Sequence, residues 1–209
     1  MRPGKYVVIE GHDGTGKSTQ VGLIRQKLLQ IGIDSIEFHE PAGSPMADAI
    51  RTILKNGNIK REAMTDMLLF SAARHELWHK RALPALKSGK WVVASRNYYS
   101  TLAYQGYGEG LDFNLIEKTT EYATDKHYLR PDVPLILDLD NDAREERIKQ
   151  RGELENPDNF ESKNDLFQTR VRHGYLDIAK DRNIVIISAD QTIEQIAKEI
   201  WKHIEPKTT

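Results

Sequence analysis

The stretch GHDGTGKST, from Gly11 to Thr19, decides the fold of this chain. It has the form G-x-x-x-x-G-K-[ST], which is the pattern of a phosphate-binding loop, or P-loop. Glycines in such a loop let the backbone turn tightly and aim its N–H groups at phosphate oxygens. Lys17 is placed to reach the outer phosphates, and the hydroxyl of Ser18 is placed to ligate a magnesium ion. We therefore expect a nucleotide phosphate site here.

The sequence on either side of the loop supplies the strand and the helix that a P-loop requires. Residues 5–10 (KYVVIE) form a short apolar run rich in β-branched side chains, which is typical of a buried strand. After the loop, Val21, Ile24 and Leu28 recur at helical spacing, and Gly32 provides a stop. The alternative interpretation, a flexible glycine-rich surface turn, predicts neither of these neighbours.

The composition limits the class of protein and its partners. The 209 residues include 30 Lys and Arg against 31 Asp and Glu, so we expect no general attraction to nucleic acid or to an acidic membrane. The chain has no cysteine, which excludes a disulfide framework and favours a reducing, cytoplasmic compartment. The P-loop begins at residue 11, so we expect no signal peptide before it.

Strands and helices alternate along the rest of the chain. Short apolar runs predict four further strands, at residues 34–39, 91–95, 133–139 and 184–188. Strands that alternate with helices form a parallel sheet covered on both faces. We therefore expect an α/β, three-layer P-loop NTPase fold, with a five-stranded parallel sheet and helices on both faces, in a single domain over residues 1–209.

Local signals mark several of the helices. Ser44 is expected to cap a helix that carries proline in its first turn. Residues 64–87 predict a long helix, which Pro84 should kink or end. Thr192 and Gln195 are expected to form the capping box of the last helix.

Polar and aromatic residues gather where the predicted strands end. Residues 96–106 follow the strand at 91–95, at the edge where open α/β sheets bind ligands, and their side chains suit recognition of a sugar or a base. Asp138, late in another strand, is either a magnesium-binding carboxylate or a structural residue. Taken alone, Arg51 fits a solvated helix charge and Phe70 fits simple core packing.

A second short motif, HELWH at residues 75–79, matches the zinc-protease pattern H-E-x-x-H. No third histidine or glutamate ligand follows at a familiar short spacing, and Pro84 interrupts the helix soon after. We therefore do not expect a zinc site in this helix.

Residues 142–151 form a charged helical segment that leads into a polar loop. Most such segments are solvated faces. In a P-loop enzyme, an arginine-bearing flexible segment late in the chain is also typical of a lid that closes over the phosphates. We expect such a flexible lid at about residues 141–162.

Several ordered motifs resemble the thymidylate kinase family, and the resemblance covers nearly the whole chain. These motifs are IEGHDGTGKSTQ (9–20), HEPAGS (39–44), AIR (49–51), LLFSAAR (68–74), PALKSGK (84–90), STLAYQG (100–106), RGEL (151–154) and VRHGYLDIAK (171–180). STLAYQG carries the most weight, because it is peculiar to this family among P-loop kinases.

The resemblance implies transfer of a phosphoryl group from ATP to dTMP, with Mg²⁺ as cofactor, giving dTDP and ADP in a homodimeric enzyme. It implies that ATP is bound by Gly11, His12, Asp13, Gly14, Thr15, Gly16, Lys17, Ser18 and Thr19, with Ser18 as the metal ligand. It implies that dTMP is bound by Asp13, Arg51, Phe70, Arg74, Arg96, Ser100, Thr101, Tyr104 and Gln105. The implied catalytic residues are Lys17, Arg96 and Arg151.

The resemblance also implies a division of labour among the dTMP contacts. Phe70 would stack on thymine, and Arg74 and Gln105, helped by Thr101, would bind its polar edge. Arg51 and Arg96 would hold the phosphate, because a planar guanidinium suits that anion. Asp13 would accept a hydrogen bond from the sugar 3′-OH, and Tyr104 would crowd the 2′ position and disfavour ribonucleotides.

The chain departs from the family pattern at the phosphate end of the site. The family's Asp-Arg-Tyr is Ser95-Arg96-Asn97 here, and the missing aspartate normally lies beside the magnesium ion, so Glu10 is a candidate to compensate. The family's Arg-Glu-Pro is HEP at residues 39–41. These changes leave open a related kinase for another deoxynucleotide or a nucleoside, and a nucleotide-binding protein with little catalysis.

A further departure concerns the catalytic arginine. Gly14 stands where other family members place an arginine in the P-loop, and the lid pattern Asp-Arg-x-Glu is DNFE at residues 158–161. If a lid charge is needed, Arg151 is the expected source and Arg147 is the second candidate.

Overall fold

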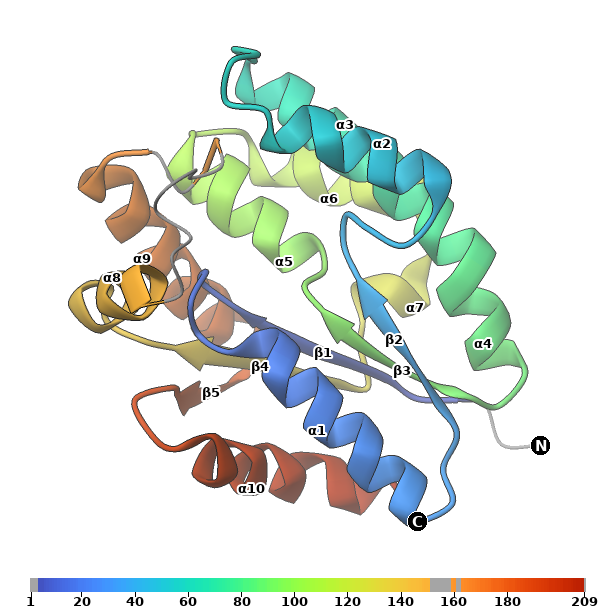
Figure 1. The fold of residues 1–209 in the computed structure, drawn as a ribbon. Coiled ribbons are helices and arrows are strands. Elements are labelled where there is room, and N and C mark those ends of the chain that lie inside the picture. The colour runs from blue at the N-terminus through green and yellow to red at the C-terminus, as the bar shows by residue number, and fades with distance from the viewer. Residues whose placement is uncertain (1–3, 151–158, 161–162, 209) are drawn as a thin grey trace.

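The computed structural model describes residues 4–150, 159–160 and 163–208, and it confirms the predicted five-stranded parallel sheet. The strands are β1 (Tyr6–Gly11), β2 (Ser35–His39), β3 (Trp91–Ser95), β4 (Val133–Asp138) and β5 (Val185–Ser188). They lie in the order β2-β3-β1-β4-β5, and all neighbouring pairs are parallel. β1 is therefore the central strand, and the P-loop leaves the carboxyl edge of the sheet from its end (Figure 1).

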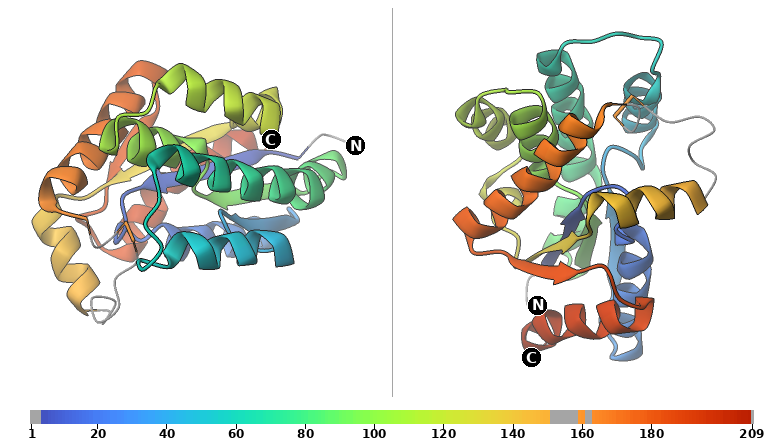
Figure 2. Two further views of the ribbon diagram at one scale, coloured as in Figure 1. Left: turned by 90° about the horizontal axis from the view of Figure 1, so that it is seen from above. Right: turned by 90° about the vertical axis from the view of Figure 1, so that its left-hand side faces the viewer.

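Helices cover both faces of this sheet, which confirms the three-layer fold (Figures 1 and 2). The described helical elements are α1 (Lys17–Gln30), α2 (Pro45–Lys55), α3 (Ala63–Leu77), η1 (Trp78–Ala82), α4 (Leu83–Lys87), α5 (Tyr98–Thr101), η2 (Leu102–Gly108), α6 (Phe113–Ala123), α7 (Lys126–Leu129), α8 (Asn141–Gln150), α9 (Asp165–Arg182), α10 (Ile193–Ile204) and η4 (Glu205–Lys207).

Alternate side chains of β1 enter two separate hydrophobic cores. Tyr6 and Val8 pack into the core beneath α2, α3 and α9, whereas Val7 and Ile9 pack into the core beneath α1 and α10. All four side chains are fully buried. Because successive side chains of a strand point to opposite faces, this one apolar run fixes both layers of helices.

The predicted long helix over residues 64–87 is divided into three parts. α3 ends at Leu77, η1 follows as a π-helical turn, and α4 begins at Leu83. Pro84 has no backbone N–H to donate, and it lies in the first turn of α4, where that donor is not needed. The prediction that Pro84 disturbs this helix is therefore confirmed, with the irregular turn placed just before it.

Residues 98–108, for which the sequence predicts ligand contacts but no particular element, are helical. α5 is one turn long, and η2 continues it with π-helical hydrogen bonding. π-Helical turns are rare and occur frequently at functional sites. This turn carries Tyr104 and Gln105, which are both buried.

Two predicted helix caps are confirmed. The Ser44 hydroxyl accepts a hydrogen bond from the backbone N–H of Ala47 at 3.2 Å, and Thr192 and Gln195 form a capping box. The predicted lid at residues 141–162 overlaps α8, but residues 151–158 and 161–162 lie outside the described residues. Within the described ranges, no helix has the length and apolar character that crossing a membrane requires.

Candidate active site

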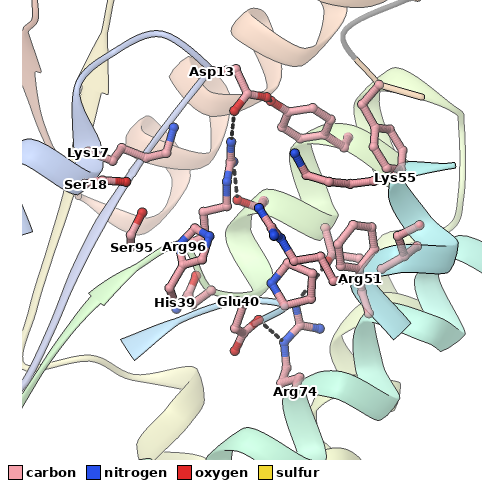
Figure 3. A pocket seen from close by; sticks show the side chains of 18 of the residues that line it. Asp13, Lys17, Ser18, His39, Glu40, Arg51, Lys55, Arg74, Ser95 and Arg96 are labelled. Carbon is pink, nitrogen blue, oxygen red and sulfur yellow. Dashed lines mark hydrogen bonds and ion pairs between the residues drawn. The ribbon is translucent and has the colours of Figure 1, made fainter. Parts of the chain in front are cut away.

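A cavity of 510 Å³ opens where β1, β2 and β3 end (Figure 3). The P-loop closes one side of it, and α2, α3 and the α5–η2 turn close the other. Its lining residues are Asp13, Gly14, Gly16, Lys17, Ser18, Thr19, His39, Glu40, Pro41, Arg51, Leu54, Lys55, Phe70, Arg74, Ser95, Arg96, Asn97, Ser100, Thr101, Tyr104, Gln105 and Phe160. The lining is strongly cationic at the P-loop end and aromatic at the opposite end.

The P-loop adopts a path that its glycines permit. Gly11 has a φ of 138°, and a Cβ on it would lie 2.3 Å from the carbonyl oxygen of Leu137. Gly14 has a φ of 84°, and a Cβ there would lie 3.2 Å from Cγ of Arg144. The glycines therefore serve backbone conformation and the close approach of β4 and α8.

Lys17 begins α1 and is buried beneath the loop that precedes it. Its Nζ donates to the carbonyl oxygen of His12 at 2.7 Å, and the hydroxyl of Thr15 donates to the same oxygen at 2.8 Å. Ser18, the next residue, is exposed at the cavity. The ammonium group and a hydroxyl thus lie together at the N-terminus of α1, where the helix dipole also favours an anion.

Arg96 links the end of β3 to the P-loop. Its Nη2 donates to Oδ1 of Asp13 in an ion pair, and the hydroxyl of Tyr104 donates to Oδ2 of Asp13 at 2.7 Å (Figure 3). Burial acts to raise the pKa of Asp13, but the positive charges of Arg96 and Lys17 outweigh it and hold that pKa below its usual range. Asp13 is therefore ionised at neutral pH, with both oxygens committed to fixed partners.

The backbone of Arg96 is in the left-handed region, with a φ of 75°. Non-glycine residues seldom adopt this conformation, and it persists where surrounding contacts enforce it. Here the enforcing contact is the fully buried Glu10, whose carboxylate accepts from the backbone N–H groups of Asn97 at 2.7 Å and Ser100 at 3.0 Å. Glu10 therefore sets the turn that presents Arg96.

A second buried ion pair lies at the floor of the cavity. Nε of Arg74 donates to Glu40 at 2.9 Å and to the hydroxyl of Tyr128 at 2.8 Å, and its Nη2 donates to the hydroxyl of Thr101 at 3.0 Å. Nη1 of Arg74 has no hydrogen-bond partner among the described residues. Arg74 and Thr101 are thus held together at the end of the cavity that contains Phe70.

The cavity brings together all nine residues predicted to contact dTMP. Of the predicted ATP-binding residues, Asp13, Gly14, Gly16, Lys17, Ser18 and Thr19 line it. Gly11, His12 and Thr15 belong to the same loop but are buried and do not line the cavity. Arg151 lies outside the described residues.

Several residues that line the cavity were not predicted as site residues, although some of them could have been predicted from their positions in the sequence. Lys55 lies four residues after Arg51 on α2, so the two share a helix face. Ser95 directly precedes Arg96 and could be read from the strand end. His39 likewise lies at a strand end, whereas Phe160 reaches the cavity through the fold alone.

The cavity offers a magnesium ion a hydroxyl ligand but no uncommitted carboxylate among its described residues. Asp13 and Glu40 are held by arginines, and Asp138 makes two hydrogen bonds of 2.9 Å with Arg172. The magnesium-binding interpretation of Asp138 is therefore disfavoured, and Glu10 does not replace the family's aspartate because its carboxylate is buried among donors. The donor set fits a cation carried mainly by phosphate oxygens and water, with Ser18 as the protein ligand.

The H-E-x-x-H motif takes part in other contacts. Glu76 pairs with Lys80 at 2.6 Å, and Nδ1 of His75 lies 2.7 Å from the carbonyl oxygen of Ala123. The described residues contain no group of three or more potential ligands arranged to hold a metal ion.

Comparison with known proteins identifies the family. The family model for thymidylate kinase matches residues 9–200. The chain belongs to the thymidylate kinase family. Thymidylate kinases from Halothermothrix orenii and Pseudoalteromonas translucida are 35% and 39% identical to it, over 97% and 96% of this chain and 97% and 94% of theirs.

The fold agrees with a solved member of the thymidylate kinase family. The crystal structure of thymidylate kinase from Ehrlichia chaffeensis superposes with a TM-score of 0.78 at 28% identity, and the match covers 97% of this chain and 100% of that one. The P-loop NTPase fold and the kinase class, a phosphotransferase, are therefore both confirmed.

The buried imidazole of His12 makes stability depend on pH. Burial, and next the Arg144 guanidinium, lower the pKa of His12 to about 3. The unfolded chain binds this proton near pH 6.5, so stability is fully present above that pH and is lost as pH falls toward 3. Between pH 7 and 5 this residue should lower the free energy of unfolding by about 2 kcal/mol.

Urea unfolding of the His12→Leu variant at both pH values measures this contribution. Between pH 7 and 5, the free energy of unfolding of the variant should fall by about 2 kcal/mol less than that of the wild type. His173→Leu, at an exposed position of α9, is the matched control and should keep the wild-type dependence. An unchanged pH dependence in His12→Leu contradicts the assignment.

Proposed function

We propose that this chain transfers the γ-phosphoryl group of Mg·ATP to the 5′-phosphate of dTMP, giving dTDP and ADP, in the cavity at the end of the P-loop. Its membership of the thymidylate kinase family makes it a dTMP kinase. The observation that supports the proposed geometry is the ion pair between Asp13 of the P-loop and Arg96, the residue after β3. This pair joins the donor phosphate loop to the side chains proposed to bind the acceptor.

The donor nucleotide is proposed to bind along the P-loop. Lys17 leaves the His12 carbonyl, which it now contacts at 2.7 Å, for the outer phosphate oxygens. Ser18 holds the magnesium ion, which screens the negative charge of the phosphates when it is bound. The backbone N–H groups of the loop supply the remaining donors.

The acceptor phosphate is proposed to bind between Arg51 of α2 and Arg96, the residue after β3, which both line the cavity (Figure 3). Two guanidinium groups match the geometry of a phosphate better than ammonium groups do. The sugar lies beside Asp13 and Tyr104, where a 3′-OH donates to the carboxylate. The ring of Tyr104 then occupies the space that a 2′-OH would need.

The thymine base is proposed to bind at the aromatic end of the cavity. Phe70 offers a face for stacking, and Gln105 and Arg74 offer hydrogen-bonding groups for the polar edge. Arg74 Nη1, which has no partner among the described residues, is the donor available for the base. Thr101 orients that guanidinium through its hydroxyl, at 3.0 Å from Nη2.

The remaining positive charge for transfer is proposed to come from an arginine of α8 or from Arg151, which follows α8 in the sequence. Arg151 keeps this role as a proposal. Arg147 is a weaker candidate, because its Nη2 donates to the carbonyl oxygen of Ala189 at 2.8 Å. Arg144 is a new candidate, since its side chain lies against Gly14 and its Nε has no partner among the described residues.

A cytoplasmic location, a homodimer, and a single domain with a lid also remain proposals. Exposed apolar side chains on α2 and α3, among them Met46, Ile53, Met64 and Leu68, support a contact between two copies. Light scattering on the purified protein would test this, and a mass of one chain at micromolar concentration would contradict it.

A panel of acceptors in a coupled ADP-release assay tests the proposed reaction. With Mg²⁺ and ATP, dTMP should support turnover at least about tenfold better in kcat/KM than thymidine, which lacks the acceptor phosphate, or dCMP, whose base carries an amino group where thymine has a carbonyl group. A preference for another acceptor supports the related-kinase alternative. Binding of both nucleotides without product supports the alternative of a binding protein.

The stacking role of Phe70 predicts a selective loss of affinity. Phe70→Ala should raise the Kd of dTMP by about tenfold or more, since base–aromatic stacking contributes about 1–3 kcal/mol. The Kd of a non-hydrolysable ATP analogue should stay within about twofold, because Phe70 lies away from the P-loop. Thr65→Ala, at an exposed position of the same helix, is the control for calorimetry. An equal loss for both nucleotides would contradict the stacking role.

The role of Arg151 predicts a loss of rate without a comparable loss of binding. Arg151→Ala should lower kcat by about a hundredfold, because it removes a charge that stabilises the transferring phosphoryl group. Lys149→Ala, at an exposed position of α8, is the matched control and should keep kcat near the wild-type value. An unchanged kcat in Arg151→Ala would move the role to Arg144, which the same substitution there would test.

A further inference from the structure

Gln168 of α9 is a buried polar residue to which neither the sequence motifs nor the proposed reaction assigns a role. Its side chain is 5% exposed. Its Nε2 donates to the carbonyl oxygens of Phe160 at 2.9 Å and Lys163 at 3.2 Å, and its Oε1 lies 2.8 Å from Nε2 of His12. One amide therefore joins His12 of the P-loop to Phe160 and Lys163, which precede α9. We call these three hydrogen bonds of Gln168 the junction.

The direction of each hydrogen bond in this junction is fixed. The two carbonyl oxygens can only accept, so the amide nitrogen of Gln168 must face them and its oxygen must face His12. Nε2 of His12 therefore carries a proton and donates it. Because the low pKa of His12, about 3, keeps the ring neutral, the junction has one arrangement of donors at neutral pH.

On the P-loop side, the junction holds the residue that contacts the phosphate-binding lysine. The carbonyl oxygen of His12 accepts from Lys17 Nζ at 2.7 Å. The ring of His12 is 3% exposed, so it is fixed by packing as well as by Gln168. A shift of this ring therefore displaces the carbonyl group that Lys17 binds.

On the other side, the junction holds the residue whose ring covers the base end of the cavity. The ring centroid of Phe160 lies 5.8 Å from that of Phe70 and 5.9 Å from that of Tyr104. Atoms in contact lie about 3.5 Å apart, so a base between two parallel rings needs about 7 Å between them. A base that stacks on the covered face of Phe70 must therefore displace Phe160.

We propose that Gln168 is a positioning residue that couples binding of the acceptor base to the conformation of the P-loop. This inference rests on the proposed function, because it requires a base beside Phe70. Displacement of Phe160 moves its carbonyl group, Gln168 follows that group, and His12 follows Gln168. The donor and acceptor nucleotides then change each other's affinity by the same factor, as thermodynamic linkage requires.

Isothermal titration calorimetry with dTMP and AMP-PNP, a non-hydrolysable ATP analogue, measures this coupling. Each nucleotide is titrated alone and in the presence of the other. In the wild type, each should tighten the binding of the other by about fivefold or more. A wild-type protein that binds both nucleotides without this effect overturns the inference.

Two substitutions separate the two halves of the junction. Gln168→Glu keeps an oxygen for His12 but loses the N–H groups that donate to the two carbonyl oxygens. Each nucleotide should then change the Kd of the other by less than about twofold. The Kd of AMP-PNP alone should stay at the wild-type value. His12→Leu should also abolish coupling, with weaker AMP-PNP binding. A purely structural role would lower thermal stability and leave the coupling factor of the folded variants unchanged.

Controls keep the result decisive. Gln168→Leu removes all three hydrogen bonds without a charge and serves if the glutamate variant does not fold. Gln26→Glu and Gln26→Leu, at an exposed position of α1, should keep wild-type coupling. Folded Gln168 variants with wild-type coupling overturn the inference, whereas a wild type that does not bind dTMP overturns the proposed function itself.

Discussion

The rest of the site depends on the hydrogen bonds that the buried carboxylate of Glu10 accepts. It lies at the end of β1 and accepts hydrogen bonds from the backbone N–H groups of Asn97 and Ser100 and from the hydroxyls of Ser100 and Tyr175. An ionised carboxylate away from water costs much free energy unless such donors surround it. Here the donors come from Asn97, which caps α5, from Ser100 of α5 and from Tyr175 of α9, so one side chain holds α5 and α9 against the P-loop strand.

The position of Arg96 follows from this constraint. Its left-handed backbone costs about 1–3 kcal/mol, which the hydrogen bonds that Asn97 and Ser100, just after it, donate to Glu10 offset. From that turn its guanidinium reaches Asp13, and Asp13 binds Tyr104 of η2. The carboxylate of Asp13 thus holds the guanidinium of Arg96 and the hydroxyl of Tyr104 in place without a nucleotide. Binding then costs less side-chain conformational entropy.

The sequence predicts the elements that local patterns encode and misses those that depend on distant contacts. The five strands are visible because each is a short apolar run, and the P-loop is visible because its glycines are spaced for one backbone path. The pairing of Arg74 with Glu40 spans 34 positions and leaves no periodic signal. Phe160 reaches the cavity only because α9 and Gln168 bring it there. The departure at Ser95 was visible, but the use of Glu10 was not.

The central claim is that Glu10 acts on the acceptor phosphate through Arg96. The most direct test compares the affinities of dTMP and thymidine, which differ by that phosphate, for the wild type and the isosteric Glu10→Gln variant. Calorimetry should show dTMP binding weakened by about tenfold or more, because an amide cannot accept from all of these donors, with thymidine affinity within about twofold. Equal weakening of both ligands, or unchanged dTMP affinity in a folded variant, would contradict the account.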